Sequence, residues 1–260
     1  MPTHMHTMLV IGHPGHEIRC HGWMSRCRPI VQVLTSGGGA SRTGRIESTR
    51  RTVQEAGAAC GRLFGSYSDH EVYAFMLAGE AGGLADWAEA LAIEIVGHRP
   101  TTLVTDMVEG YNTSHDLLAY LVDAAVAKAA RLAGVRTRVL CQPLVGRPDQ
   151  AWQGRRKPSE LLALDEATYA AKLSAAGAYP ELKAEVEQAL RETGPEAFRT
   201  EAFYDAPSGE SLLTTLPDPT PYYETFGEQQ VRRGKYNHVI RHKEHLIPLA
   251  RDVRRRMGLD

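Results

Sequence analysis

Two histidines stand three residues apart, directly after an apolar run near the start of the chain. The run covers residues 8–11 and leads into Gly-His-Pro-Gly-His at residues 12–16. Such a run predicts a buried strand, and the Pro-Gly pair predicts a tight turn at its carboxyl end. Neutral imidazoles are common metal ligands. The spacing therefore predicts that His13 and His16 converge on one metal ion, and two solvated histidines at a strand end are the alternative.

A third histidine follows a second strand-like run, residues 101–106, which ends on Asp106. A long helix is expected from residue 117 to residue 132, with Thr113 or Ser114 as its cap, so His115 lies in the first turn. In open α/β sheets, ligands bind in the crevice outside the carboxyl ends of the strands. If the two strands are neighbours, His115 joins the first two histidines there.

The elements that must position these residues alternate between strand and helix up to residue 150. Further strands are expected over residues 29–35 and 135–140, and helices over residues 46–59, 69–77 and 84–96. This alternation predicts an α/β fold, a Rossmann-like three-layer arrangement with a mostly parallel central sheet. Residues 1–150 are therefore interpreted as the metal-binding core.

The pattern changes after residue 150. Helices are expected over residues 159–176, 180–192 and 240–257, with a proline-rich connection over residues 207–221. We interpret residues 151–260 as a mostly helical C-terminal extension packed on the core.

Composition excludes several classes of protein. The 260 residues carry a formal net charge of −1, with basic and acidic residues interspersed, so no nucleic-acid partner is expected. There is no apolar run of membrane-spanning length and no secretory signal, so no membrane partner and a cytoplasmic location are expected. The four cysteines form no CxxC pair and are expected to be small buried hydrophobic residues. A small-molecule substrate is expected, and a homo-oligomer is compatible with the sequence.

Taken together, these motifs resemble a known family. Gly-His-Pro-Gly-His-Glu at residues 12–17, the strand that ends on Asp106, and the turn at residues 109–116 resemble the LmbE-like, or PIG-L-like, N-acetylglucosaminyl deacetylase superfamily. The C-terminal segment over residues 221–236 is also similar to that of some bacterial members. The resemblance implies a zinc-dependent hydrolase that removes an acyl group from a small N-acylated substrate, such as a sugar or a secondary-metabolite intermediate.

The resemblance also shows departures from the family motif. The family opening is His-Pro-Asp-Asp-Glu, in which the histidine and second aspartate bind zinc and the first aspartate is the general base. His13 and His16 then take the ligand positions, and Gly15 takes the position of the base. In the later turn, usually Gly-His-Pro-Asp-His, His115 matches the third ligand and Asn112 stands in place of the histidine partner.

Three neutral histidines suit a catalytic zinc ion, and the loss of one carboxylate leaves more positive charge on it. Amide hydrolysis also needs a proton donor for the amine, and Asp106 and Glu109 are the preferred candidates. Asn112 is a candidate donor to the oxyanion of a tetrahedral intermediate.

Other polar residues near these motifs are assigned supporting roles. Glu17 and Asp116 adjoin ligand histidines and are candidates for fixing the ring tautomers. Arg19, Arg42 and Tyr111 are candidates for binding a sugar or an acid group of the substrate.

Two further interpretations stay open. Three neutral histidines also suit iron, as Fe²⁺, or copper, which would indicate a metalloenzyme of another reaction class on the same scaffold. The second open interpretation is a non-catalytic binding protein that keeps the fold. Metal content separates the three interpretations.

Overall fold

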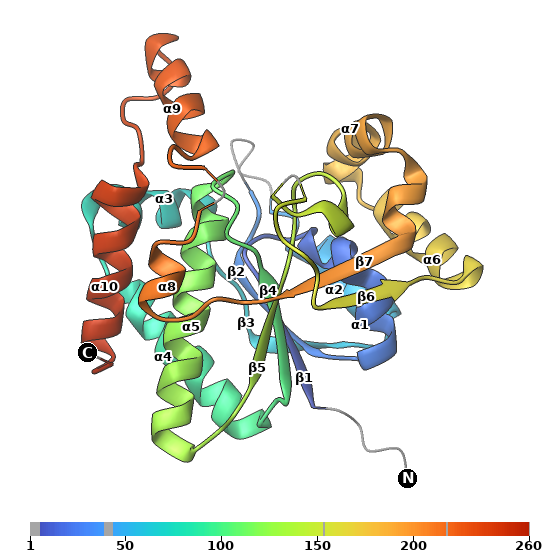
Figure 1. The fold of residues 1–260 in the computed structure, drawn as a ribbon, viewed down its shortest axis with the longest axis horizontal. Coiled ribbons are helices and arrows are strands. Elements are labelled where there is room, and N and C mark those ends of the chain that lie inside the picture. Colours follow the sequence, from blue (N-terminus) through green and yellow to red (C-terminus); the bar gives the residue numbers. More distant parts are fainter. Residues whose placement is uncertain (1–5, 39–43, 153, 217, 260) are drawn as a thin grey trace. The chain divides into compact units, whose positions relative to one another are not determined.

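Strand β1 (Thr7–Ile11) is buried along its whole length within a seven-stranded sheet. Consecutive buried residues are typical of the inner strands of parallel sheets. The computed structural model describes residues 6–38, 44–152, 154–216 and 218–259. Figure 1 shows the arrangement of the elements along the chain.

The order of the strands across the sheet is β3-β2-β1-β4-β5-β7-β6. The first five of these are parallel, and β7 is antiparallel to both β5 and β6. This mostly parallel sheet confirms the predicted α/β class. The other strands are β2 (Ile30–Thr35), β3 (Ala59–Tyr67), β4 (Thr102–Asp106), β5 (Arg138–Gln142), β6 (Glu160–Ala163) and β7 (Thr200–Asp205).

After β1, the chain forms β2 and β3 on one side of β1, and it then crosses to form β4 on the other side of β1. The strand order therefore reverses between β1 and β4. Such a reversal opens a crevice at the carboxyl ends of the two strands, which is where α/β proteins bind ligands. The residues after Ile11 and the residue Asp106 both lie at this point of the sheet.

The described chain divides into two units. The first unit combines Met1–Ser68, Pro100–Asp106 and Arg138–Ala206, and the second combines Asp69–Arg99, Met107–Thr137 and Pro207–Asp260. Every strand belongs to the first unit. The boundary predicted at residue 150 falls inside that unit, and the separation of a core from an extension stays a prediction.

In the first unit, the sheet packs against helices through a core of aliphatic and aromatic side chains. This core joins Leu9, Val33 and Val104 of the sheet to Trp23 and Met24 of helix α1. The helical elements are η1 (His16–Cys20), α1 (His21–Cys27), α2 (Ile46–Glu55), η3 (Pro148–Gln150), α6 (Glu166–Gly177), η4 (Pro180–Leu182), α7 (Lys183–Thr193) and η5 (Pro195–Arg199).

The regular elements of the second unit, among its described residues, are all helices. Helix α10 packs on α4 and α5, and Arg254 of α10 makes an ion pair of 2.6 Å with Asp123 of α5. Its helices are α3 (Asp69–Ala78), α4 (Gly82–His98), α5 (Thr113–Ala133), α8 (Glu210–Leu213), α9 (Tyr222–Arg232), the short π-helix η6 (His242–Leu246), and α10 (Ile247–Arg256).

The predicted helix over residues 159–176 is wrong in its first part. Residues 160–163 form strand β6, which pairs with β7, and the helix begins only after Asp165, whose side chain accepts a hydrogen bond of 2.8 Å from the Thr168 amide. The leucine and alanine residues of β6 favour a helix locally, but pairing with β7 overrides that preference. Strands β3 and β7 were also not predicted.

All four cysteines are free thiols, as their spacing predicts. Cys20 and Cys141 are buried, whereas Cys27 and Cys60 are half-buried. Within the described residues, none of the helices combines the length and the apolar character needed to cross a membrane.

A buried ion pair between Lys172 and Glu201 joins α6 to β7, and the same Glu201 carboxylate joins β7 to the start of α1 through hydrogen bonds. Glu201 on β7 accepts hydrogen bonds of 2.8 Å from the backbone amides of Gly22 and Trp23 and from the Lys172 ammonium group. Lys172 also donates to the Arg19 carbonyl over 2.9 Å. Burial lowers the pKa of Lys172, and the neighbouring Glu201 carboxylate opposes that shift. The pair therefore holds the segment after η1 against the sheet.

We expect Lys172→Met to lower the free energy of unfolding by about 3–5 kcal/mol, because it leaves the Glu201 charge buried without its cation. Urea unfolding followed by circular dichroism measures the change. The matched control is Arg191→Met, which removes an exposed ion pair with Glu187 and should change stability by less than about 0.5 kcal/mol. Equal effects of the two substitutions would contradict a structural role for the buried pair.

Candidate functional site

The turn after β1 carries both predicted N-terminal ligands. The His16 amide donates to the His13 carbonyl over 3.3 Å, which closes the turn. Gly15 adopts a φ of 105°, in the left-handed region that favours glycine. The turn thus bends sharply, and the two imidazole rings meet edge to face with their centroids 5.3 Å apart.

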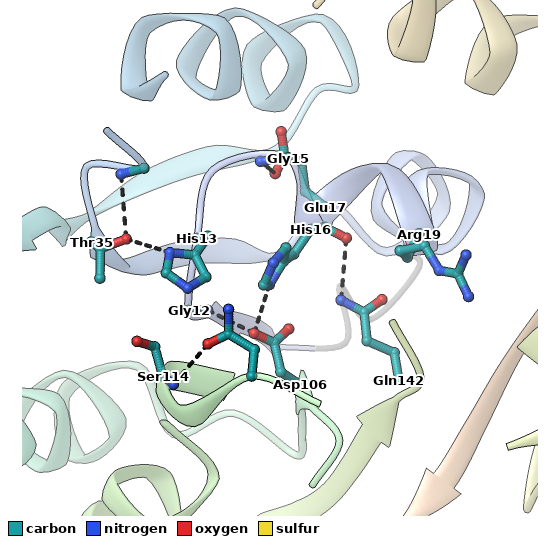
Figure 2. Close-up of polar contacts among 12 residues, drawn as sticks. Gly12, His13, Gly15, His16, Glu17, Arg19, Thr35, Asp106, Ser114 and Gln142 are labelled. Atoms are coloured by element: carbon teal, nitrogen blue, oxygen red, sulfur yellow. Dashed lines mark hydrogen bonds and ion pairs between the residues drawn. The ribbon is translucent and has the colours of Figure 1, made fainter. Parts of the chain in front are cut away.

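Asp106 connects this turn to the neighbouring strand β4. Its Oδ2 atom accepts hydrogen bonds from the Gly12 amide over 2.8 Å and from His16 Nδ1 over 2.7 Å (Figure 2). Asp106 is fully buried. Because the carboxylate is an acceptor, it favours the His16 tautomer that carries its proton on Nδ1.

His13 is held in a similar way from strand β2. Its Nδ1 atom lies 2.8 Å from the Thr35 hydroxyl at the carboxyl end of that strand, as Figure 2 shows. His13 is 9% exposed. In both histidines, a buried polar group therefore orients the ring through Nδ1, which is the arrangement typical of metal-binding histidines that ligate through Nε2.

Glu17 does not take the orienting role that its position next to His16 suggests. It is fully buried, and it accepts a hydrogen bond of 2.8 Å from the Gly15 amide and another from the Tyr179 hydroxyl. Burial raises the pKa of the Glu17 carboxyl, and the hydrogen bonds from Tyr179 and Gly15 oppose the shift. Asp106 is the carboxylate that holds His16.

Sequence reasoning missed Gln142 at this edge of the sheet. Gln142 ends strand β5 and pairs in register with Asp106 on β4. Its Nε2 donates to the His16 carbonyl over 3.3 Å (Figure 2). A polar residue at the end of an otherwise apolar strand was the available signal, because parallel strands bring their carboxyl ends to one edge.

Arg19, one of the two arginines predicted to bind substrate, contacts the loop after β5. Arg19 donates from Nε to the Pro143 carbonyl over 3.1 Å and from Nη2 to the Gly146 carbonyl over 2.9 Å. It thus holds the loop after β5, and a contact with substrate stays a prediction. Arg42 lies outside the described residues.

The second unit contains the rest of the predicted site. Asn112, not Thr113 or Ser114, caps helix α5, since its Oδ1 accepts a hydrogen bond of 2.8 Å from the Ser114 amide. His115 lies in the first turn of α5, as predicted, and is buried.

Asp116 is fully buried and closes the loop before α5. Its Oδ1 accepts hydrogen bonds from the amides of Glu109, over 3.0 Å, and Gly110, over 3.3 Å. The predicted substrate residue Tyr111 is 47% exposed and stacks on Tyr222, with ring centroids 5.0 Å apart. Asp116 therefore fixes the loop that presents Glu109 and Tyr111.

The predicted metal ligands are divided between the units: His13 and His16 belong to the first, and His115 belongs to the second. In the part of the chain that the structure describes, no three or more His, Cys, Asp or Glu side chains form a group able to hold a metal ion. The first unit nevertheless supplies two oriented imidazoles, and imidazole suits Zn²⁺ and Fe²⁺. The His115 assignment stays a prediction from the motif.

Asp106 provides a further observation on the fit of a cation. Its second oxygen, Oδ1, is buried and has no hydrogen-bond partner among the described residues. A buried carboxylate oxygen without a donor is costly unless a positive charge or a proton compensates it. The donor chemistry beside His16 therefore fits a bound cation.

Gly15 leaves little room for a larger side chain. A Cβ atom built at Gly15 would overlap Leu182 Cδ1 of η4. The positive φ adds backbone strain for any other residue. Glycine at this position therefore suits both the backbone conformation and the neighbouring leucine.

We expect Gly15→Ala to lower the free energy of unfolding by about 1–3 kcal/mol because of the positive φ and the displaced leucine. Urea unfolding measures the change. Gly97→Ala in helix α4 is the control: it meets open space and has no positive φ, so it should be neutral or slightly stabilising. A neutral Gly15→Ala would show that the turn tolerates a side chain.

The raised pKa of the Asp116 carboxyl predicts that the free energy of unfolding depends on pH. Burial raises its pKa from 3.8 to about 7, and backbone hydrogen bonds oppose the shift. Between these two pH values, the unfolded chain releases a proton that the folded chain keeps, so rising pH favours unfolding. The free energy of unfolding therefore falls by up to about 4 kcal/mol, and the fall is complete somewhat above pH 7.

The test compares the wild type with Asp116→Asn, which keeps the acceptor for the two amides but does not ionise. Urea unfolding in the presence of a chelator should show the variant gaining stability over the wild type from pH 4 to pH 7, with no further change above that range. A difference that is constant with pH would show that Asp116 has an ordinary pKa.

No protein-family model matches the chain, and no curated protein matches it. The chain is similar in structure to the conserved protein TT1542 from Thermus thermophilus, with a TM-score of 0.51 and 18% sequence identity over 79% of this chain and 96% of that one. At this identity the likeness shows the fold alone, and it confirms the three-layer α/β class expected from the sequence.

Two further similar structures are deacetylases. One is a triple mutant of Orf2 from the teicoplanin biosynthetic pathway, with a TM-score of 0.49 and 13% identity over 77% of this chain and 97% of that one. The other is the A40926 pseudoaglycone deacetylase Dbv21, with a TM-score of 0.47 and 14% identity over 78% and 97%. Because their TM-scores lie below 0.5, the assignment of an activity has to come from the site.

Proposed function

We propose that the protein is a metal-dependent hydrolase that removes an acyl group from a small N-acylated molecule, such as a sugar or a secondary-metabolite intermediate. One observation supports this most directly. At the point where the strand order reverses, His13 and His16 stand together, and Thr35 and Asp106 each fix one ring through Nδ1. Oriented imidazoles at this edge of an α/β sheet are an arrangement suited to holding a catalytic cation.

The proposal assigns the cation to Nε2 of His13 and His16, with His115 as the third ligand expected from the motif. Zn²⁺ is the first choice and Fe²⁺ the alternative. When bound, such an ion supplies Lewis-acid polarisation of the acyl carbonyl. A small-molecule substrate, a cytoplasmic location and a homo-oligomer stay predictions.

The remaining roles fall to the polar residues of the chain itself. Asp106 keeps His16 in one tautomer, so Glu109 is the better candidate for giving a proton to the departing amine. Capping of α5 occupies Oδ1 of Asn112 and leaves its Nδ2 group as the candidate donor to the oxyanion.

Metal content and activity test the proposal together. Protein purified without added metal should hold about one zinc or iron ion per chain by mass spectrometry. It should hydrolyse members of a panel of N-acetylated amino sugars. His13→Ala, His16→Ala and His115→Ala should each lose the metal and the activity. Asp106→Ala should weaken metal binding by about 10–100-fold, because the His16 ring loses its orientation.

The control is His98→Ala, which alters an exposed histidine at the end of α4 and should keep both properties. A wild-type chain without metal or hydrolytic activity would overturn the proposal in favour of a binding protein. Redox-active iron or copper without hydrolysis would favour the other class of metalloenzyme. Retention of metal and activity by His115→Ala alone would remove His115 from the site.

A further inference from the structure

The turn that carries the two histidines is covered by a segment from far along the chain. This segment, residues 178–182, joins α6 to α7 and includes Tyr179 and Leu182; we call it the strap. Leu182 occupies the space that a side chain at Gly15 would need. The strap and the turn both belong to the first unit.

A chain of hydroxyl groups connects the strap to the turn. The Thr49 hydroxyl of α2 lies 2.8 Å from the Tyr179 hydroxyl, and the Tyr179 hydroxyl donates to Glu17. Glu17 in turn accepts from the Gly15 amide over 2.8 Å. Thr49, Tyr179 and Glu17 are all almost completely buried, with at most 1% of each exposed.

Helix α2, which supplies Thr49, makes further contacts with the strap. The Ser48 hydroxyl donates to the Glu181 carboxylate, with distances of 3.0 and 3.1 Å to its two oxygens. Arg51 Nη2 donates to the Ala178 carbonyl over 3.5 Å. Contacts of α2 with Ala178 and Glu181 therefore hold the backbone before and after Tyr179, whose hydroxyl contacts Glu17.

We propose that Tyr179 is a positioning residue for the histidine turn. Through Glu17 it sets the backbone at Gly15, and the backbone at Gly15 sets the directions of the His13 and His16 rings. A carboxylate that is fully buried needs its donors, so removal of the Tyr179 hydroxyl changes how Glu17 holds the Gly15 amide. The consequence for catalysis rests on the proposed function, whereas the consequence for the rings does not.

The test is Tyr179→Phe, with Tyr169→Phe as the matched control. Tyr169 lies in α6 and is also buried, but its hydroxyl donates to the Pro195 carbonyl, in η5 and not in the histidine turn. Each substitution removes one hydroxyl from a tyrosine of the first unit that is at most 4% exposed. Only Tyr179→Phe should affect the histidine turn.

Three readouts apply. The ¹⁵N chemical shifts of the imidazole nitrogens, in protein labelled at histidine and free of metal, should change for His13 or His16 in Tyr179→Phe and stay unchanged in Tyr169→Phe. The dissociation constant for Zn²⁺, from competition with a chromophoric chelator, should rise about tenfold only in Tyr179→Phe. For a hydrolysed substrate, kcat should fall while KM changes less than about twofold.

Thr49→Val provides a second variant if Tyr179→Phe fails to fold. It removes the hydroxyl that holds Tyr179 while it keeps the Tyr179 contact with Glu17 and the shape of the side chain. It should shift the same imidazole resonances by a smaller amount. Unchanged imidazole shifts and unchanged Zn²⁺ affinity in a folded Tyr179→Phe or, failing that, in Thr49→Val would overturn the positioning role.

The outcomes separate this inference from the proposed function. If the wild type binds no metal and hydrolyses nothing, the imidazole shifts still decide whether Tyr179 positions the turn. If the wild type binds zinc and hydrolyses amides while Tyr179→Phe matches Tyr169→Phe in every readout, the positioning role fails and the proposed function stands.

Discussion

The site depends on one buried carboxylate at the end of β4. Asp106 has no access to solvent, and its Oδ2 atom accepts from both the Gly12 amide and His16 Nδ1. Burial makes each donor to this carboxylate valuable, so the two hydrogen bonds to Oδ2 constrain the backbone after β1 and the His16 ring together. The parallel register of β1 and β4, with Val10 opposite Thr105, brings these groups within reach. A shift of that register by one residue would turn Asp106 to the other face of the sheet.

Buried carboxylates that accept from backbone amides recur along the segment that follows β1. Asp106 accepts from the Gly12 amide, Glu17 from the Gly15 amide, and Glu201 from the amides of the first turn of α1. All three carboxylates are at most 1% exposed. Three buried acidic groups therefore accept from backbone amides between Gly12 and Trp23, a stretch that comprises the histidine turn, η1 and the start of α1. In the second unit, Asp116 fixes the loop before α5 in the same manner.

Much of this arrangement could be predicted from the sequence, because it depends on local patterns. The apolar runs of β1 and β4, the turn with Gly15, and the position of His115 in α5 all follow from short segments. Strand β3 was not predictable in that way, since it contains two glycines and no regular alternation, and its register with β2 is interrupted. Strand β6 has helix-forming residues and becomes a strand only through its pairing with β7, which lies about 40 residues away. The contacts of Glu17 with Tyr179 and of His16 with Asp106 cross even longer separations, and no local pattern reveals which carboxylate serves which partner.

The structure around residue 15 favours glycine. Leu182 fills the space beside Gly15, and the positive φ at this residue opposes any side chain. Glu17, the nearest acidic residue in the chain, uses its two oxygens to accept from the Gly15 amide and from Tyr179. It therefore holds the turn, and it is fully buried from solvent. The proposed hydrolysis therefore needs a proton donor other than Glu17.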